Sequence, residues 1–359
     1  MIRFLVRRLW YGLWVLFGVV TVVFLLFNVL PGDPARMMLG QRADITSVET
    51  IQRELGLDRP VHKQYLHYLN DLSPVSLHKT SNEESLVYLD PETYSYVRLL
   101  PLGDHSLVLK KPYLRRSYQS DRPVTEILAS AFPNTLLLAS VSILFAMFVG
   151  IILGAFIALK RKPWLSRTAL VFSVFGMSLP SFFAAILIAW VFAYLLGDIT
   201  GLSMTGSLYE VDDFGRGEYI EWRNLVLPAI TLGIRPLAIV TELTRSSLNQ
   251  VMAQDFIRTA RAKGLSERRI ITRHAMKNAM NPVVTAISGW FASLMAGAVF
   301  VEYVFDWKGI GVVIVDALEY YDFPVLMGAV LLISVVLVLI NIAVDILYAR
   351  LDPRVRLSS

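Results

Sequence analysis

Long apolar segments alternate with polar segments along the whole chain, and six of the apolar segments approach the length of a membrane span. They cover residues 9–30, 134–159, 168–196, 225–243, 282–305 and 325–348. A bilayer core about 30 Å thick requires roughly 20 mostly apolar residues in an α-helix. A single segment of this kind is also compatible with a buried helix of a soluble protein. Six with almost no internal charge predict an all-α membrane protein with six transmembrane helices.

The composition agrees with this pattern. Hydrophobic residues make up 55% of the 359 residues and charged residues 18%. Soluble domains have about a quarter of their residues charged. The balance excludes a soluble enzyme, a disordered scaffold and a nucleic-acid-binding protein as first interpretations. The chain has no cysteine, so it forms no disulfide and offers no thiolate as a nucleophile or metal ligand.

The first apolar segment resembles a signal peptide in its basic start, which contains Arg3, Arg7 and Arg8. The apolar run is longer than the 7–15 residues of a typical signal peptide, and no small-residue cleavage site follows it. The chain instead continues with Leu-Pro-Gly-Asp-Pro at 30–34. We therefore expect residues 1–30 to form an N-terminal tail and an uncleaved first span.

The distribution of charge predicts the orientation. If the N-terminus is cytoplasmic, the inside segments are the N-terminal tail, 160–167, 245–281 and the tail from Arg350. They carry 18 basic and three acidic residues, whereas the outside loops 197–224 and 302–324 carry three basic and eleven acidic residues. Cytoplasmic loops of membrane proteins are enriched in Lys and Arg. This predicts a multi-pass membrane protein with both termini cytoplasmic.

Residues 31–133 are expected to form an extracytoplasmic region, followed by a five-helix core at 134–359. Helices are predicted from the cap at Thr46 or Ser47 to about Gly56, and over 61–72, where Tyr65, Leu66, Tyr68 and Leu69 supply an apolar face. Segments 86–89 and 106–109 are typical of short strands, so 73–118 is predicted to be a small β-rich insertion. Two interpretations stay open: a surface elaboration, or a docking surface for an extracytoplasmic partner. The spacing of the four histidines in this region is not that of a metal site, and we assign none.

The cytoplasmic segment 255–282 is predicted to hold two short helices. Asp255 suits the positive end of the first helix dipole, and Arg261 and Lys263 suit its negative end. Gly264 can adopt the left-handed conformation that ends a helix. Ser266 can cap the second helix, which we expect to end at Asn281 before Pro282. The pattern alone is also compatible with an amphipathic helix that lies on the anionic inner leaflet.

The same segment resembles the EAA-type loop of permease subunits of ABC importers, in the dipeptide/oligopeptide and nickel branch. The matching residues are Arg258-Thr259-Ala260-Arg261-Ala262-Lys263-Gly264-Leu265, Arg273-His274-Ala275 and Asn278-Ala279 before Pro282. Further landmarks occur in order at 7–8, 30–34, 56–60, 64–65, 178–182, 227–228, 243–247, 302–305, 309–311, 345–348 and 351–356. The resemblance covers the chain except about 73–118, and the fourth span is more charged than is usual in the family.

The resemblance implies a type I ABC importer fold and the inner-membrane component of a binding-protein-dependent transport system. The chain would form half of a pore for peptides or similar small solutes and would not be an enzyme. Its implied partners are a second, related permease, two cytoplasmic ATPase subunits that bind ATP and Mg, an extracytoplasmic solute-binding protein and membrane lipid. The chain itself has no Gly-x-x-x-x-Gly-Lys-Ser/Thr motif for phosphate binding. A channel or secondary transporter without ATPases remains the alternative.

The resemblance also implies the site that couples the permease to an ATPase subunit, within the loop 245–281. The expected contact residues are Asp255, Arg258, Thr259, Ala260, Arg261, Ala262, Lys263, Gly264 and Leu265. Small Ala260 and Ala262 would let the partner approach, and the cations would meet acidic groups of the partner.

Candidate residues for a translocation path lie in the third and fourth spans. Pro180 and Pro236 remove helical hydrogen bonds, and Ser181 follows the first of them. Arg235 and Glu242 are charges within a span, which usually face a bundle interior or water. They are seven residues apart, about 10 Å along a helix, so we do not expect them to pair with each other. Either a pore-lining role for Arg235 or a structural pairing with another span is compatible with the sequence.

Overall fold

The structure is a computed structural model that describes residues 2–29, 52, 56–81, 87–91, 93–160, 162–212 and 217–351. The Leu-Pro-Gly-Asp-Pro segment at 30–34, the helix start expected at 46–47 and the C-terminal tail after 351 lie outside the described residues. The chain divides into two compact units. The bundle unit comprises residues 1–10, 131–312 and 335–359, and the sheet unit comprises residues 11–130 and 313–334.

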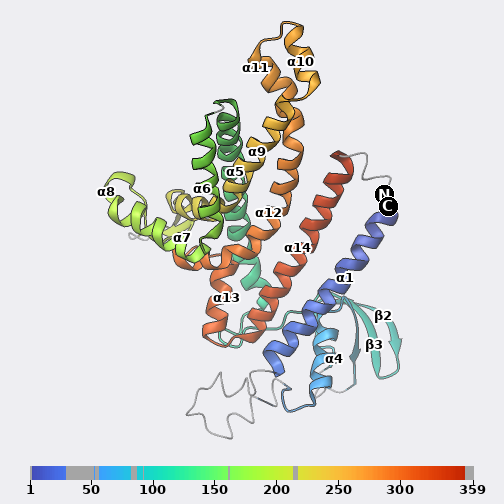
Figure 1. Cartoon of the computed structure of the whole chain (residues 1–359). Coiled ribbons are helices and arrows are strands. Elements are labelled where there is room, and N and C mark those ends of the chain that lie inside the picture. The colour runs from blue at the N-terminus through green and yellow to red at the C-terminus, as the bar shows by residue number, and fades with distance from the viewer. Residues whose placement is uncertain are drawn as a thin grey trace. The chain divides into compact units, whose positions relative to one another are not determined.

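Helices dominate the described chain (Figure 1). They are α1 Ile2–Phe24, α4 Val61–Leu72, α5 Val124–Lys160, α6 Pro163–Ser178, α7 Ser181–Ile188, α8 Gly197–Thr200, α9 Arg223–Met252, α10 Asp255–Ala262, α11 Glu267–Arg269, α12 Met276–Phe305, α13 Ile310–Glu319 and α14 Phe323–Leu351. Three π-helical segments continue or join them: η1 Leu25–Val29, η2 Ala189–Leu195 and η3 Ile270–Ala275.

Four of these helices are long and apolar enough to cross a membrane: Val6–Val29, Val124–Lys160, Arg223–Met252 and Phe323–Ile346. Two bent pairs pass the same test together. Pro163–Ser178 meets Ser181–Leu195 at 109°, and Glu267–Met295 meets Gly297–Phe305 at 56°. The described residues therefore contain four straight candidate spans, and up to six if each bent pair is one span. Each predicted apolar segment overlaps one of these helices or pairs over most of its length.

Several boundaries differ from the expectation. Helix α5 begins at Val124 rather than near 134, because its first turns are helical but not apolar enough to read as a span. Helix α9 continues past the predicted end at 243 to Met252 and passes through Pro236 without a break. Helix α13 and the short hairpin of β4 Tyr209–Val211 with β5 Glu218–Ile220 lie in loops for which no element was predicted.

Small residues let the helices of the bundle unit pack closely. A Cβ atom added at Gly154 of α5 would lie 2.5 Å from the Thr241 carbonyl oxygen of α9, and one at Gly233 of α9 would lie 2.8 Å from a ring carbon of Phe145. Such residues bring helix backbones together where lipid offers no hydrophobic driving force for association. The largest fully buried side chain, Trp307, completes the apolar core beside Phe305.

In the sheet unit, α4 packs against the second half of α1. The apolar contacts join Tyr65, Tyr68, Leu69 and Leu72 of α4 to Val20, Val23 and Phe24 of α1. The hydroxyl oxygens of Thr21 and Tyr65 share a hydrogen bond of 2.6 Å, which satisfies both groups inside this contact. The predicted bounds of α4 are confirmed, but Leu66 is 61% exposed and does not belong to the packed face. It lies outside the i, i+3, i+4 stripe set by Tyr65, Tyr68 and Leu69.

The predicted β-rich insertion is confirmed as a three-stranded antiparallel sheet. It consists of β1 Val75–Lys79, β2 Tyr96–Leu102 and β3 His105–Lys110 in the order β1-β3-β2. The strand expected at 86–89 is wrong for the residues described there, since Tyr88 makes only an isolated bridge to Lys79. Asn70 joins α4 to β1, donating to the Leu77 carbonyl at 3.1 Å and accepting from the Leu77 amide at 3.0 Å.

A buried carboxylate lies between α4 and the sheet. Asp71 is 1% exposed and accepts hydrogen bonds from the Arg115 guanidinium and the Tyr94 hydroxyl, both at 3.1 Å. A buried charge needs such a cation and further donors, because desolvation otherwise outweighs its attraction to any partner. Burial also lowers the pKa of His67, whose Nε2 lies 3.5 Å from Asp71, and raises the pKa of Tyr68 to about 12.

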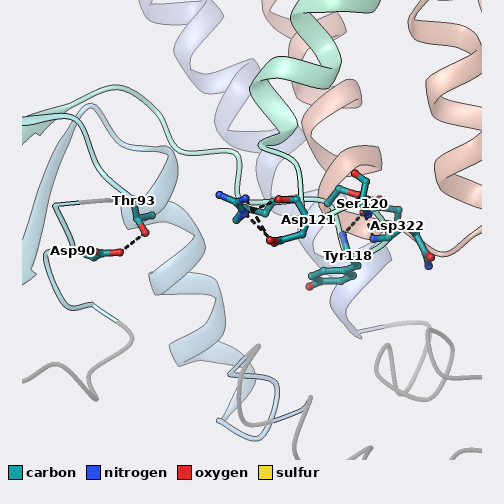
Figure 2. A network of polar contacts seen from close by, with 9 residues as sticks. Asp90, Thr93, Tyr118, Ser120, Asp121 and Asp322 are labelled. Atoms are coloured by element: carbon teal, nitrogen blue, oxygen red, sulfur yellow. Dashed lines mark hydrogen bonds and ion pairs between the residues drawn. The ribbon is translucent and has the colours of Figure 1, made fainter.

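A polar network fixes the loop that leads from the sheet to α5 (Figure 2). Asp322, before α14, accepts from the Ser117 hydroxyl at 2.5 Å and from the Tyr118 amide at 3.0 Å. Arg116 pairs with Asp121 at 2.9 Å in the same loop. These bonds within the sheet unit hold the start of α5 beside the turn between α13 and α14.

Candidate functional site

Helix α10 is a short helix with sharply defined ends. At its start Gln254 has extended backbone angles, and its carbonyl oxygen accepts from the Ile257 amide at 3.1 Å. Asp255 occupies the first turn, as predicted, where the helix dipole favours a negative charge. At the other end Gly264 has φ +74°, which confirms the predicted left-handed residue. Figure 1 shows α10 and α11 at one end of α9 and α12.

The two faces of α10 have different surroundings. Ile257 and Ala260 are buried, at 0% and 7% exposure, in a cluster with residues of α5, α9, η3 and α12. The expectation that Ala260 lets a partner approach is therefore wrong, because this residue faces the chain's own helices. The exposed face of α10, which we call the outer α10 face, consists of Asp255, Phe256, Arg258, Thr259, Arg261 and Ala262. Leu265 is half-buried and packs against the same apolar cluster.

The cations of the outer α10 face have carboxylate neighbours in their own chain. Arg258 lies 3.3 Å from Asp255, and both side chains are highly exposed, at 76% and 94%. Arg261 lies 2.6 Å from Glu267 of α11. Solvent screens exposed pairs of this kind and leaves them a small contribution to stability, so a partner surface can replace them at small cost.

The segment after Gly264 differs from the expectation. Ser266 precedes α11 and its carbonyl oxygen accepts from the Ile270 amide at 3.0 Å, but its side chain makes no cap hydrogen bond. The predicted end of the helix at Asn281 is wrong, since α12 continues through Pro282 to Phe305. A proline removes one helical hydrogen bond, and long membrane helices tolerate that loss. The segment between α9 and α12 is thus helical almost throughout and contains no long irregular stretch.

Pro180, Ser181 and Arg235 are brought together, and Glu242 is not. Helix α6 ends at Ser178, and α7 begins at Ser181 in a new direction. The Arg235 guanidinium donates to the Leu179 carbonyl at 3.0 Å. This oxygen has no helical partner because the helix ends there, so Arg235 satisfies an orphan acceptor at the break.

Glu242 pairs with Arg245, one turn further along α9. The two oxygens of the carboxylate accept from the guanidinium at 2.5 and 3.0 Å, and the side chains are 31% and 22% exposed. Such bidentate geometry is the strongest form of this interaction. The expectation that Arg235 and Glu242 do not pair with each other agrees with these contacts.

A buried polar cluster that joins α12, α13 and α5 was not among the predicted sites. Glu302 is 0% exposed and accepts from the Gly311 amide at 2.6 Å, while the Ile310 amide donates to the Thr135 hydroxyl at 2.8 Å. A Cβ at Gly311 would lie 2.5 Å from the Val299 Cα. Glu302 therefore caps the first turn of α13, and glycine is required for the approach. The spacing from Glu302 to the Gly-x-Gly at 309–311 was the available signal.

Comparison with known proteins identifies the class of protein to which this geometry belongs. The family described as "Binding-protein-dependent transport system inner membrane component" matches residues 150–357. The N-terminal region of such membrane components matches residues 1–82. The chain belongs to this family of transport permeases, and it is not an enzyme by family.

Individual proteins that are similar to this chain show which members of the family it resembles. It is 33% identical over 356 residues to the glutathione transport system permease protein GsiC of Escherichia coli K12, with 99% of each chain covered. The protein of the same name from Shigella dysenteriae serotype 1 matches equally well. The MetNI methionine ABC transporter, solved in inward-facing conformations, aligns with a TM-score of 0.50 at 16% identity, over 64% of this chain and 97% of that chain.

These findings agree with the resemblance seen in the sequence. The chain is a permease subunit of an ATP-driven importer, with the fold of the type I importers and several membrane-spanning helices in a bacterial inner membrane. The alternative of a channel or secondary transporter is not favoured.

Proposed function

We propose that this permease forms half of a pore for peptides or peptide-like solutes. GsiC is named for glutathione, which is itself a small peptide, and the relatives cover the whole chain. A second, related permease would supply the other half of the pore. An extracytoplasmic binding protein would deliver the solute, and membrane lipid would surround the spans.

The outer α10 face is the proposed docking site for one of two cytoplasmic ATPase subunits. The observation that carries this proposal is the shape of α10: a helix of eight residues with one buried face, one exposed face and a glycine at φ +74° beyond its end. A rigid element of this kind can transmit the closure of an ATPase pair to α9 and α12, which it joins. ATP and Mg would be bound by the partner subunits, and this chain would contribute Arg258, Thr259, Arg261 and Lys263 to the contact.

The residues near the bend between α6 and α7 are the proposed part of the translocation path. Pro180 and Ser181 form the bend, and Arg235 holds it through the Leu179 carbonyl. Glu242 lies one to two turns nearer to α10 along α9. Because Arg235 of α9 bonds directly to the bend, movement of α9 can change the angle of the bend, and this supports a role in alternating access.

The absence of native cysteine allows a direct test of the docking site. A photo-crosslinker attached to Thr259→Cys or Ala262→Cys should join the permease to an ATPase subunit in membranes. The same label at Ser120→Cys, which is also exposed and is expected on the other side of the membrane, should not. Labels at 259 and 262 that react fully and crosslink no ATPase would contradict the proposal.

The proposed orientation has a separate test. A reporter that is active only in the cytoplasm should be active when fused after Ser359 or within 160–167, and inactive within 31–133. An active reporter in 31–133 would reverse the topology and place α10 on the wrong side for an ATPase.

A further inference from the structure

One face of the three-stranded sheet carries a contiguous patch of aliphatic side chains, most of them exposed, with Lys79 and His105 at one end of the face. The strand register places Val75, Leu109 and Val97 in one row across the sheet and Leu77, Leu107 and Leu100 in the next. Leu102 pairs with His105 at the end of the same face. Residues opposite one another on neighbouring strands point to the same side of a sheet. We call this surface the aliphatic sheet face.

The exposure of its side chains is high. Val75, Leu77 and Leu109 are 49%, 43% and 46% exposed, and Val97, Leu100 and Leu102 are 64%, 57% and 56% exposed. The opposite side of the sheet is the buried one, with Ser76, His78, Ser106 and Val108 all at 4% or less. A contiguous aliphatic patch of this kind on a soluble surface marks an interaction site for a protein or a membrane.

The contacts that attach the sheet to α4 and α1 indicate that the sheet lies near the membrane. Asn70 bonds β1 to α4, and α4 packs on α1 between Val20 and Phe24. The apolar span of α1 ends at Val29. The α4 contact thus lies five to nine residues before that end, or roughly 8–14 Å along the helix axis. Because the hydrocarbon core begins near the end of the apolar run, this contact lies on the membrane side of that end, and α4 is held beside the lipid of the leaflet there.

The chemistry of the face also favours lipid over protein. Protein interfaces are enriched in aromatic residues and Arg and carry hydrogen bonds, whereas the two central rows of this face consist only of Val and Leu and its polar residues, Lys79 and His105, lie at one end. Strand addition by a peptide partner is disfavoured as well. Pro101 lies in the edge strand β2, which also has a bulge between Arg98 and Leu100, and Asn70 occupies the outer edge of β1.

We infer that the aliphatic sheet face lies against the bilayer leaflet at the Val29 end of α1 and anchors the insertion to the lipid surface. The inference goes beyond the proposed transport function. It does not depend on which side of the membrane that leaflet faces, so it can fail while the transport proposal stands. The insertion is then neither a surface elaboration without a partner nor a docking site for a protein, but a small domain bound to the lipid surface beside the first span.

Spin labelling of the full chain in lipid nanodiscs tests this inference. Nitroxide labels at Val97→Cys and Leu100→Cys should collide several-fold more often with oxygen, relative to a water-soluble nickel complex, than a label at Arg98→Cys. Arg98 is the matched control, because it is exposed, adjacent to Val97 and directed to the opposite side of the sheet. All three substitutions are at exposed positions, so folding should be unaffected.

Two outcomes would overturn the inference. Labels at 97 and 100 that are as accessible to nickel as the label at 98 would show that the face is in water. Labels that become shielded from both reagents only after the solute-binding protein is added would show that a protein covers the face.

Discussion

Replacement of Gly264 by Val should uncouple the permease from its ATPase while the spans remain folded. Gly264 has φ +74°, and a Cβ added there would have no heavy atom within 4 Å. The cost is therefore backbone strain alone, about 1–2 kcal/mol for a residue with a Cβ in the left-handed region. That strain shifts the equilibrium between the ordered and the frayed turn by a factor of about 5–30.

Helix α10, which ends at this turn, has too little stability of its own to offset this backbone strain. Helix α10 has eight residues and is held mainly by Ile257 and Ala260. Helices of this length are marginal without tertiary contacts. Once the turn frays, Arg258, Thr259 and Arg261 no longer present one face to a partner. The candidate spans are separate helices of 24 to 37 residues in lipid, and they should not respond.

The assay is ATPase pull-down and solute uptake in membranes that contain equal amounts of permease. Gly264→Asn is the matched control, because Asn tolerates the left-handed region far better than a β-branched residue. Gly264→Val should lose most of both signals, and Gly264→Asn should retain most of both. If Gly264→Val binds the ATPase and transports at the wild-type rate, α10 is not the coupling element, and an amphipathic helix on the inner leaflet becomes the better interpretation.

Three further predictions concern other parts of the chain. Gly311→Ala should lower the free energy of unfolding of the purified permease by about 1–3 kcal/mol, because the added Cβ would collide with the Val299 backbone. An unchanged melting temperature would contradict the tight contact between α12 and α13. The sheet unit should lose stability as pH falls below about 6.5, since burial lowers the folded-state pKa of His67 and His78 and the unfolded chain binds more protons there. Hydrogen exchange that is independent of pH between 7 and 5, after correction for intrinsic rates, would refute this. Arg235→Leu should destabilise the bend by about 1–3 kcal/mol and reduce assembly; full stability with lost uptake would instead show a purely pore-lining role.

The elements that were predictable from sequence are those set by local signals. Helix α4 begins after Pro60 and presents Tyr65, Tyr68 and Leu69 at helical spacing, and its bounds follow from these residues alone. The left-handed conformation of Gly264 was also predictable, because few other residues adopt this φ without strain. The six apolar segments follow from hydropathy, and each overlaps a helix or a bent pair over most of its length.

The remaining features depend on contacts between distant residues. Prolines at 133, 228, 236 and 282 all lie inside helices, whereas Pro180 separates two helices that meet at 109°. No local rule distinguishes Pro180 from the other four, but the Arg235 guanidinium, which lies on another helix, satisfies the carbonyl exposed at this break.

The candidate site also combines features that local sequence determines with features that depend on distant residues. The bounds and charges of α10 could be read from the sequence, but the burial of Ala260 could not, because it depends on α9, η3 and α12. Helix α13 was missed for the same reason. Its first turn is held by Glu302 and by Thr135, which is far away in the sequence.

Solute uptake by the assembled complex in sealed proteoliposomes tests the proposed ATP-driven import most directly. We predict that a small peptide enters only when ATP is supplied on the side of the ATPase subunits, and that uptake persists when ionophores collapse all ion gradients. We also predict that the permease purified without ATPase subunits shows no uptake under either condition. Uptake by the permease alone, driven by an ion gradient and independent of ATP, would contradict ATP-driven import and favour a secondary transporter.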